Sequence, residues 1–152
     1  MLQFHWSLVK TEGKYEREGM FWLCTETGNF PCPGWRDYPV IKMSVFISEI
    51  NDIIRKAYIT KRYLGFGPYY ILIDSAQKDL VTVHFLRSYL PQPLIKLPPV
   101  TLPFIAFCRI VLKAGNSMLE TYSSRDLGTP MELQSLERAV NSLSFAVSED
   151  HQ

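Results

Sequence analysis

The sequence predicts an α+β fold, in which an antiparallel sheet of about five strands carries one amphipathic helix between strands and two C-terminal helices packed on it. Apolar and polar residues alternate near the N-terminus and again between residues 61 and 87, as in half-buried strands. Apolar residues recur at helical spacing between residues 43 and 57 and again in the C-terminal third. The 152 residues, 47% of them hydrophobic, fit a single globular domain spanning residues 1–152.

The N-terminal segments predict a β-hairpin. Residues 4–8 alternate aromatic or apolar side chains with polar ones, which predicts a strand with one aromatic face. The polar, glycine-bounded stretch Glu12–Gly19 predicts a loop, and Met20–Thr25 predicts the partner strand. Glycines and prolines crowd Thr25–Pro39, which predicts a long ordered loop, and Val40–Lys42 is expected to be a short extended segment.

A helix follows. Its predicted apolar stripe is Met43, Phe46, Ile47, Ile50, Ile53, Ile54 and Ala57. Beyond it, Lys61–Phe66, Tyr69–Asp74 and Leu80–Arg87 predict an antiparallel meander with one buried face. Tyr89–Pro103 holds five of the ten prolines, so we expect a covering connector there in place of regular structure.

Two helices are expected to complete the chain. Phe104–Tyr122 carries an apolar stripe, with Pro103 in its first turn and Gly115 allowing another backbone to approach closely. Thr129, Pro130 and Glu132 form a capping-box signature that opens the last helix. The tail Ser148–Gln152 is expected to be frayed.

Net charge and cysteine content narrow the range of functions that we expect. The net charge is +1, and it is balanced along the chain: residues 1–64 hold nine Lys and Arg against seven Asp and Glu, and residues 65–152 hold seven against eight. No basic stripe is visible, so no nucleic-acid partner is expected. Cys24, Cys32 and Cys108 are odd in number and irregularly spaced, which favours three free thiols. No signal peptide or membrane span is recognised, so we expect a cytoplasmic protein without a membrane partner.

The residues that most often carry chemistry form no recognisable set. His5 and His84 are expected on the outward faces of strands, and His151 in the tail. The cysteines have no zinc-ligand spacing, and Gly65–Pro68 lacks the spacing of a phosphate loop. We therefore expect no catalytic residues, no metal and no cofactor.

Two aromatic turn segments stand out, Gly34–Pro39 and Gly65–Tyr70. Trp35, Tyr38, Tyr69 and Tyr70 lie beside glycines or prolines, so they either close the sheet against the first helix or form an exposed recognition surface. Tyr69 and Tyr70 cannot both face the core of a strand. Asp37 is expected to cap the backbone amides of Tyr38–Val40 or the start of the helix, in preference to a catalytic or partner-contacting role.

These segments carry a family resemblance. The order is an aromatic strand, then Phe30-Pro31 followed by Gly34-Trp35-x-Asp37-Tyr38-Pro39, a helix, Gly67-Pro68-Tyr69-x-Ile71 and two C-terminal helices. It resembles a group of small bacterial proteins that is similar to the immunity proteins of polymorphic toxin and contact-dependent growth-inhibition systems. The chain departs from that pattern, because Phe66 replaces the acidic residue before the Gly-Pro-Tyr segment and the helix lacks paired tryptophans.

The resemblance implies an α+β binding protein, not an enzyme, that neutralises a cognate toxin domain by direct contact. Its candidate partner-binding residues are Trp35, Arg36, Asp37, Tyr38, Tyr69 and Tyr70. One alternative is a small-molecule binder or minor enzyme with a pocket between the sheet and the Phe104–Tyr122 helix, near Tyr70, Asp74 and His84. Another is an oligomeric structural subunit; the sequence leaves the oligomeric state open.

Overall fold

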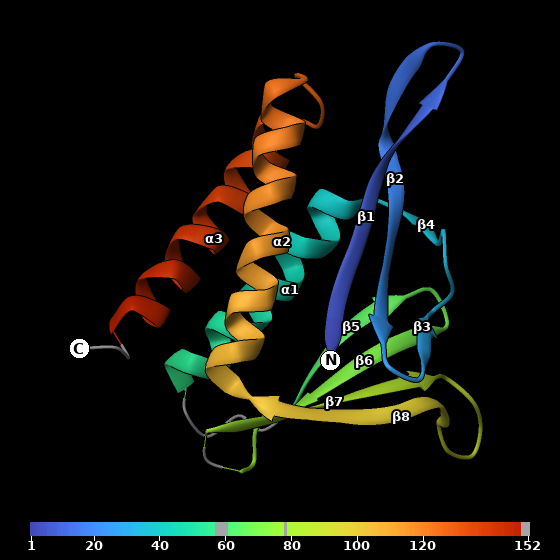
Figure 1. Ribbon diagram of the computed structural model, residues 1–152, viewed down its shortest axis with the longest axis vertical. Coiled ribbons are helices and arrows are strands. Elements are labelled where there is room, and N and C mark those ends of the chain that lie inside the picture. The colour runs from blue at the N-terminus through green and yellow to red at the C-terminus, as the bar shows by residue number, and fades with distance from the viewer. Residues whose placement is uncertain (57–60, 78, 150–152) are drawn as a thin grey trace.

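The computed structural model describes residues 1–56, 61–77 and 79–149; for residues 56 and 61–64 it describes the backbone only. It is an α+β fold, as predicted, with three helices and two four-stranded antiparallel sheets where about five strands in one sheet were expected (Figure 1). Sheet A contains β1 (Leu2–Thr11), β2 (Lys14–Thr25), β3 (Gly28–Phe30) and β4 (Arg36–Asp37). Sheet B contains β5 (Lys61–Phe66), β6 (Tyr69–Asp74), β7 (Leu80–Arg87) and β8 (Leu94–Pro103). The helices are α1 (Pro39–Lys56), α2 (Phe104–Ser124) and α3 (Pro130–Glu149).

The first hairpin is longer than its composition suggested. Glu12 and Gly13 both have positive φ, 49° and 80°, which is the backbone of a two-residue hairpin turn. The polar residues predicted as a loop up to Gly19 therefore belong to β2, where they pair with β1 beyond the edge of the core. This arm rises beside the upper ends of α2 and α3 (Figure 1). There Arg17 pairs with Glu132, and the guanidinium of Arg125 lies 4.6 Å from the ring centroid of Tyr15.

The segment predicted as one long loop, Thr25–Pro39, contains β3 and β4. Both pair with β2, in the registers Leu23 with Phe30 and Met20 with Arg36. Pairing with a long neighbour defines these short strands, which their own composition does not show. Helix α1 begins at Pro39, so residues 40–42 are helical where an extended segment was expected. Ala57 lies outside the described residues.

Sheet B is a meander in the order β5-β6-β7-β8. Its last strand corrects the prediction of an irregular connector over Tyr89–Pro103. Strand β8 is an edge strand, and its register against β7 shifts where Pro98 and Pro99 lie, between the pairs Val83–Val100 and Phe85–Leu97. A bulge at an edge tolerates residues without an amide hydrogen, so the prolines did not prevent strand formation.

The helices begin much as the sequence indicated. In the capping box of α3, the Thr129 amide donates to Glu132 Oε2 and the Glu132 amide donates to Thr129 Oγ1, both at 3.2 Å. Pro103, expected in the first turn of this helix, is the residue immediately before α2. A Cβ on Gly115 would lie 2.9 Å from Ile47 Cδ1 and 3.1 Å from Val140 Cγ2, so side chains of α1 and α3 pack closely there, where the approach of another backbone was expected. Helix α3 continues through Ser148 and Glu149, where a frayed tail was expected.

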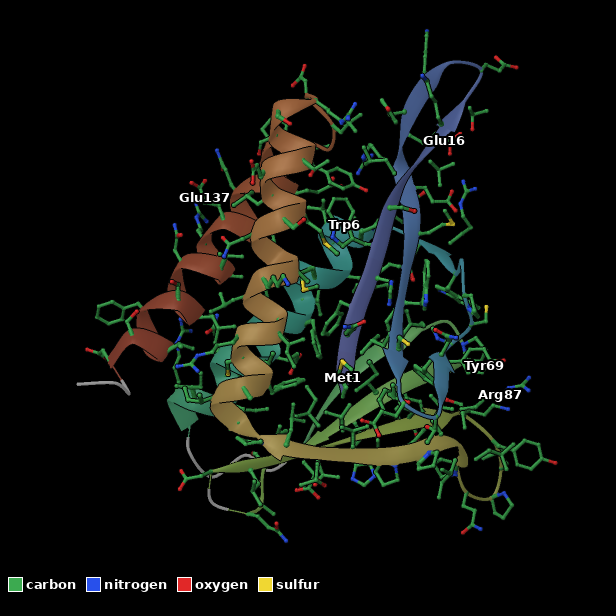
Figure 2. The ribbon with its side chains drawn as sticks, in the orientation of Figure 1. Met1, Trp6, Glu16, Tyr69, Arg87 and Glu137 are labelled. Atoms are coloured by element: carbon green, nitrogen blue, oxygen red, sulfur yellow. The ribbon has the colours of Figure 1, made fainter. Side chains whose placement is uncertain are left out.

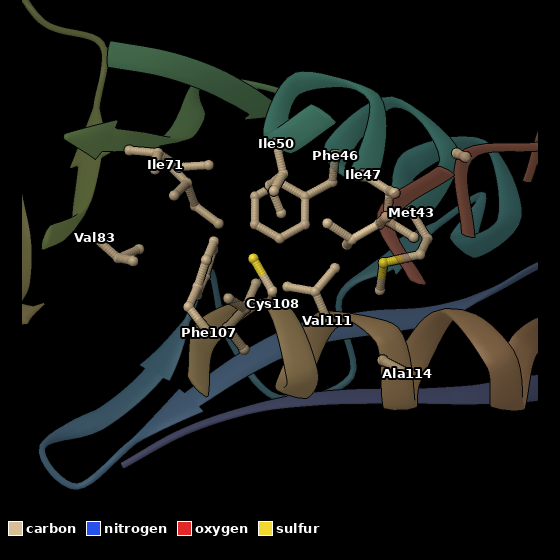
Figure 3. Close-up of a cluster of buried hydrophobic side chains, with 14 of the residues drawn as sticks. Met43, Phe46, Ile47, Ile50, Ile71, Val83, Phe107, Cys108, Val111 and Ala114 are labelled. Atoms are coloured by element: carbon tan, nitrogen blue, oxygen red, sulfur yellow. The ribbon is translucent and has the colours of Figure 1, made fainter. Parts of the chain in front are cut away.

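One cluster of buried side chains joins both sheets and all three helices. Phe21 of sheet A packs on Phe66 of sheet B at a centroid distance of 5.7 Å, and Phe46 of α1 meets Phe107 of α2 at 5.9 Å. Figure 3 shows α1 and α2 contributing side chains to this core from facing sides. Each fully buried ring stabilises the fold by roughly 1.5–3 kcal/mol. Among the described residues, no helix has the length and apolar character that a bilayer crossing requires.

Candidate functional site

The two aromatic turn segments lie against each other at the junction of the sheets. The indole of Trp35, just before β4, stands edge-on to the ring of Tyr69 at a centroid distance of 5.8 Å and an interplanar angle of 85°. A Cβ on Gly67 would lie 3.8 Å from Trp35 Cζ2, so the indole also covers the β5–β6 turn. Chain segments about thirty residues apart in sequence therefore form one surface, and Trp35 joins sheet A to sheet B.

Asp37 holds this junction in place. Its Oδ2 accepts a hydrogen bond from Trp35 Nε1 at 3.2 Å, and its Oδ1 accepts one from the Tyr38 amide at 2.8 Å. Lys42 Nζ lies 3.9 Å from Oδ2 and donates to the carbonyl oxygen of Gly65 at 2.6 Å. The predicted cap at Tyr38 is thus confirmed. With 14% of its side chain exposed, Asp37 orients the indole and links α1 to the turn of sheet B.

Tyr69 is the second fixed point. Its ring meets Phe30 edge-on at 5.9 Å as well as Trp35, and the guanidinium of Arg87 lies 5.6 Å from its centroid. Figure 2 shows Tyr69 and Arg87 at the same end of sheet B, where β6 begins and β7 ends. Tyr70 lies on the opposite face of β6, as strand alternation predicted, so the structure separates it from the other candidates. A ring held on three sides keeps one orientation, which favours a rigid surface.

Two other candidate residues lie on the solvent side. Tyr38 is 46% exposed at the start of α1. Arg36 points along sheet A and pairs with Glu16 and Glu18 at 3.1 and 3.2 Å. Exposed ion pairs of this kind contribute roughly 0–1 kcal/mol, so Arg36 can exchange these carboxylates for those of a partner at little cost.

A further segment, which the sequence did not single out, lies beside these turns. The Ser88 amide donates to the carbonyl oxygen of Pro68 at 2.8 Å, which fixes the β7–β8 loop beside the Gly67-Pro68 turn. Directly after it, Tyr89 is 61% and Leu90 is 88% exposed. The sequence did not reveal this exposure, because apolar residues among prolines were expected to cover the core, whereas both side chains face solvent. We name Trp35, Arg36, Tyr38, Tyr69, Arg87, Tyr89 and Leu90 the aromatic edge.

The titratable candidates are dispersed. His5 stacks on Trp22 at a centroid distance of 5.2 Å, and His84 lies opposite Leu72 on the outer face of sheet B. His151 lies outside the described residues. The three cysteines, all within the described residues, form no disulfide, as predicted. Over residues 1–56, 61–77 and 79–149, no group of three His, Cys, Asp or Glu side chains is placed to hold a metal ion.

A groove does lie between a sheet and the Phe104–Tyr122 helix, but the residues expected near it, Tyr70, Asp74 and His84, do not line it. Tyr70, Asp74 and His84 share the outer face of sheet B, whereas the helices pack on the face carrying Ile71 and Val83. A groove of about 440 Å³ lies between α1 and α3, and one of about 400 Å³ between β1 and α2. None of these three residues lines either groove.

One buried polar group lies apart from the aromatic edge. The Tyr122 hydroxyl is buried beside Gly19 and has no hydrogen-bond partner among the described residues. Desolvation by burial raises the pKa of Tyr122 to about 12. The phenol therefore stays neutral through the physiological range and acts as part of the core.

No family model, curated protein or solved structure matches this chain. The resemblance to immunity proteins stays a prediction.

Proposed function

We propose that this chain is an immunity-type binding protein that neutralises a cognate toxin domain by direct contact through the aromatic edge. The observation that carries the proposal is the pair Tyr89 and Leu90, which are exposed in the loop that the Ser88–Pro68 hydrogen bond fixes beside the turn preceding Tyr69. Scattered exposed apolar residues are normal, but several gathered beside buttressed aromatics are typical of a binding surface.

The composition of the edge supports the same function. Trp, Tyr and Arg dominate binding energy at protein interfaces, and Trp35, Tyr38, Tyr69 and two arginines lie here. Their frame is held before any partner arrives, by Asp37 on the indole and by Pro68 on the Ser88 amide. Because a preformed surface loses less conformational entropy on association, such a frame favours tight binding.

Charge complementarity has a smaller part in this proposal. The net charge is +1, and Arg36 already has carboxylate neighbours in the free protein. We therefore expect contacts of the rings and Leu90 to supply most of the affinity. Association should accordingly depend weakly on salt.

The test is co-expression with the toxin encoded next to this protein. The wild-type chain should co-purify with the toxin and protect cells from growth arrest. The double variant Tyr89→Ala, Leu90→Ala should weaken binding at least about tenfold, equivalent to 1.4 kcal/mol. The matched control is Met131→Ala, Phe145→Ala, since these α3 side chains are 77% and 66% exposed but lie outside the aromatic edge.

Equal weakening by both double variants would contradict the assigned surface. Absence of both co-purification and protection would overturn the immunity function itself. Turnover of a metabolite that disappears when His84 or Asp37 is replaced would identify an enzyme instead.

A further inference from the structure

A second surface, separate from the aromatic edge, lies between β1 and α2. A groove of about 400 Å³ runs there. Its walls are residues 1–4 and Trp6 from the strand side and Ile110, Lys113, Ala114 and Ser117 from the helix side. Figure 2 shows Met1 and Trp6 along β1, beside α2.

The strand wall of the groove is an open sheet edge. In the part of the chain that the structure describes, β1 pairs with β2 alone. From Leu2 to Leu8 that pairing is regular, and its first irregularity lies between Leu8 and Lys10. Half of the peptide groups along this stretch therefore point away from the sheet, which makes the edge a template for another extended chain.

The helix wall is one face of α2. Ile110, Lys113, Ala114 and Ser117 follow the i, i+3, i+4, i+7 spacing that aligns side chains along a helix. Because the side chain of Ala114 is small, the groove is deeper at the middle of this helix face. Lys113 is exposed and is the charged side chain of the groove, and no carboxylate lines it.

We propose that this groove binds an extended segment of another protein, which adds to β1 as a strand and lays its side chains against α2. Main-chain hydrogen bonds to β1 would supply affinity, and the apolar floor at Phe4, Trp6 and Ile110 would select apolar side chains. Lys113, with no carboxylate beside it in the groove, selects a segment that also carries an acidic residue.

A peptide segment fits this site better than a second copy of the chain. Helix α2 stands beside the free edge of β1, and the groove between them is lined from both elements. A second copy pairing through its own β1 would bring its own α2 into the same space. The groove shares no residue with the aromatic edge, so the inference stands independently of the proposed function.

The experiment is a selection of phage-displayed random decapeptides on the full chain. The strongest selected peptide is then synthesised, and its affinity is measured by fluorescence polarisation. Ser117→Trp fills the groove, and Lys113→Glu reverses its charge; both residues are exposed, so circular dichroism should show an unchanged fold. Each variant should weaken binding at least about tenfold, whereas the control Lys96→Glu, on exposed β8, should leave it unchanged.

Strand addition has its own signature. N-methylation of the peptide at successive positions should abolish binding at alternate residues, because every second amide hydrogen faces β1. The proposal is overturned if the selected peptides bind Ser117→Trp as well as wild type, or if N-methylation has no alternating effect. A dimer in light scattering that Ser117→Trp abolishes would instead assign the groove to a second copy.

Discussion

The indole of Trp35 and the ring of Tyr69 meet edge-on, 5.8 Å apart between centroids, although Trp35 lies between β3 and β4 of sheet A and Tyr69 begins β6 of sheet B. This contact, with Phe21 on Phe66 beneath it, joins the two sheets. A binding surface that includes Trp35 and Tyr69 is therefore as rigid as the junction between the sheets.

A double-mutant cycle measures that contact. Trp35→Ala and Tyr69→Ala should each lower the free energy of unfolding, and the double variant should lose about 1 kcal/mol less than the sum, since edge-to-face rings interact beyond their buried area. Urea denaturation of the four proteins gives the coupling. Strict additivity would show that the rings are neighbours without a specific interaction.

Lys42 tests the link between α1 and sheet B. Its ammonium donates to the Gly65 carbonyl and lies near Asp37, with 27% of the side chain exposed. Lys42→Met keeps the apolar stem and removes the charge, so the free energy of unfolding should fall by about 1 kcal/mol. Lys96→Met is the control, and its denaturation midpoint should match that of wild type.

Gly19 tests the close approach of β1, β2 and α2. A Cβ there would lie 2.6 Å from the Ser7 carbonyl oxygen and 3.2 Å from the Tyr122 hydroxyl. Because a backbone oxygen cannot rotate away, Gly19→Ala should cost about 2–3 kcal/mol. A Cβ on Gly65 meets nothing within 4 Å, so Gly65→Ala should cost far less. Equal thermal shifts for the two variants would contradict this packing.

We expect the buried Tyr122 hydroxyl to lower the free energy of unfolding at alkaline pH. Its pKa is raised from 10 to about 12 by burial, so the unfolded chain releases this proton at lower pH than the folded chain. The free energy of unfolding therefore holds below pH 10 and falls as the pH rises towards 12, by about 2–3 kcal/mol from this group. Tyr122→Phe should remove that part of the slope. Tyr89→Phe, at an exposed ring, should retain it.

The helices and the capping box could be predicted because their signals are local. The stripe from Met43 and the Thr129–Glu132 pair depend on residues within a few positions of one another. The division into two sheets could not be predicted, since β3 and β4 exist only through pairing with β2. Strand β8 was missed because proline content ordinarily argues against a strand, and the bulge that accommodates Pro98 and Pro99 depends on register.

The candidate site likewise combines features that the sequence signals locally with features that depend on tertiary packing. The two turn segments could be singled out because aromatics beside glycine and proline are visible in the chain. Their contact depends on tertiary packing, as does the separation of Tyr70 from Tyr69 to the other face of β6. The exposure of Tyr89 and Leu90 depends on where the Ser88–Pro68 hydrogen bond holds their loop, which no local pattern indicates.

The pairing of Arg17 with Glu132 spans 115 residues, and Trp6 packs on Tyr122 across a similar distance in the chain. During synthesis the N-terminal arm leaves the ribosome long before these partners exist. Phe4 packs on the early residues Phe21 and Phe46, but Trp6 has no Tyr122 to pack on until α2 emerges, which makes folding slow and largely post-translational. Truncation within α3 should therefore lead to aggregation of the nascent chain, and a chaperone that shields the arm should raise the yield of the full-length protein.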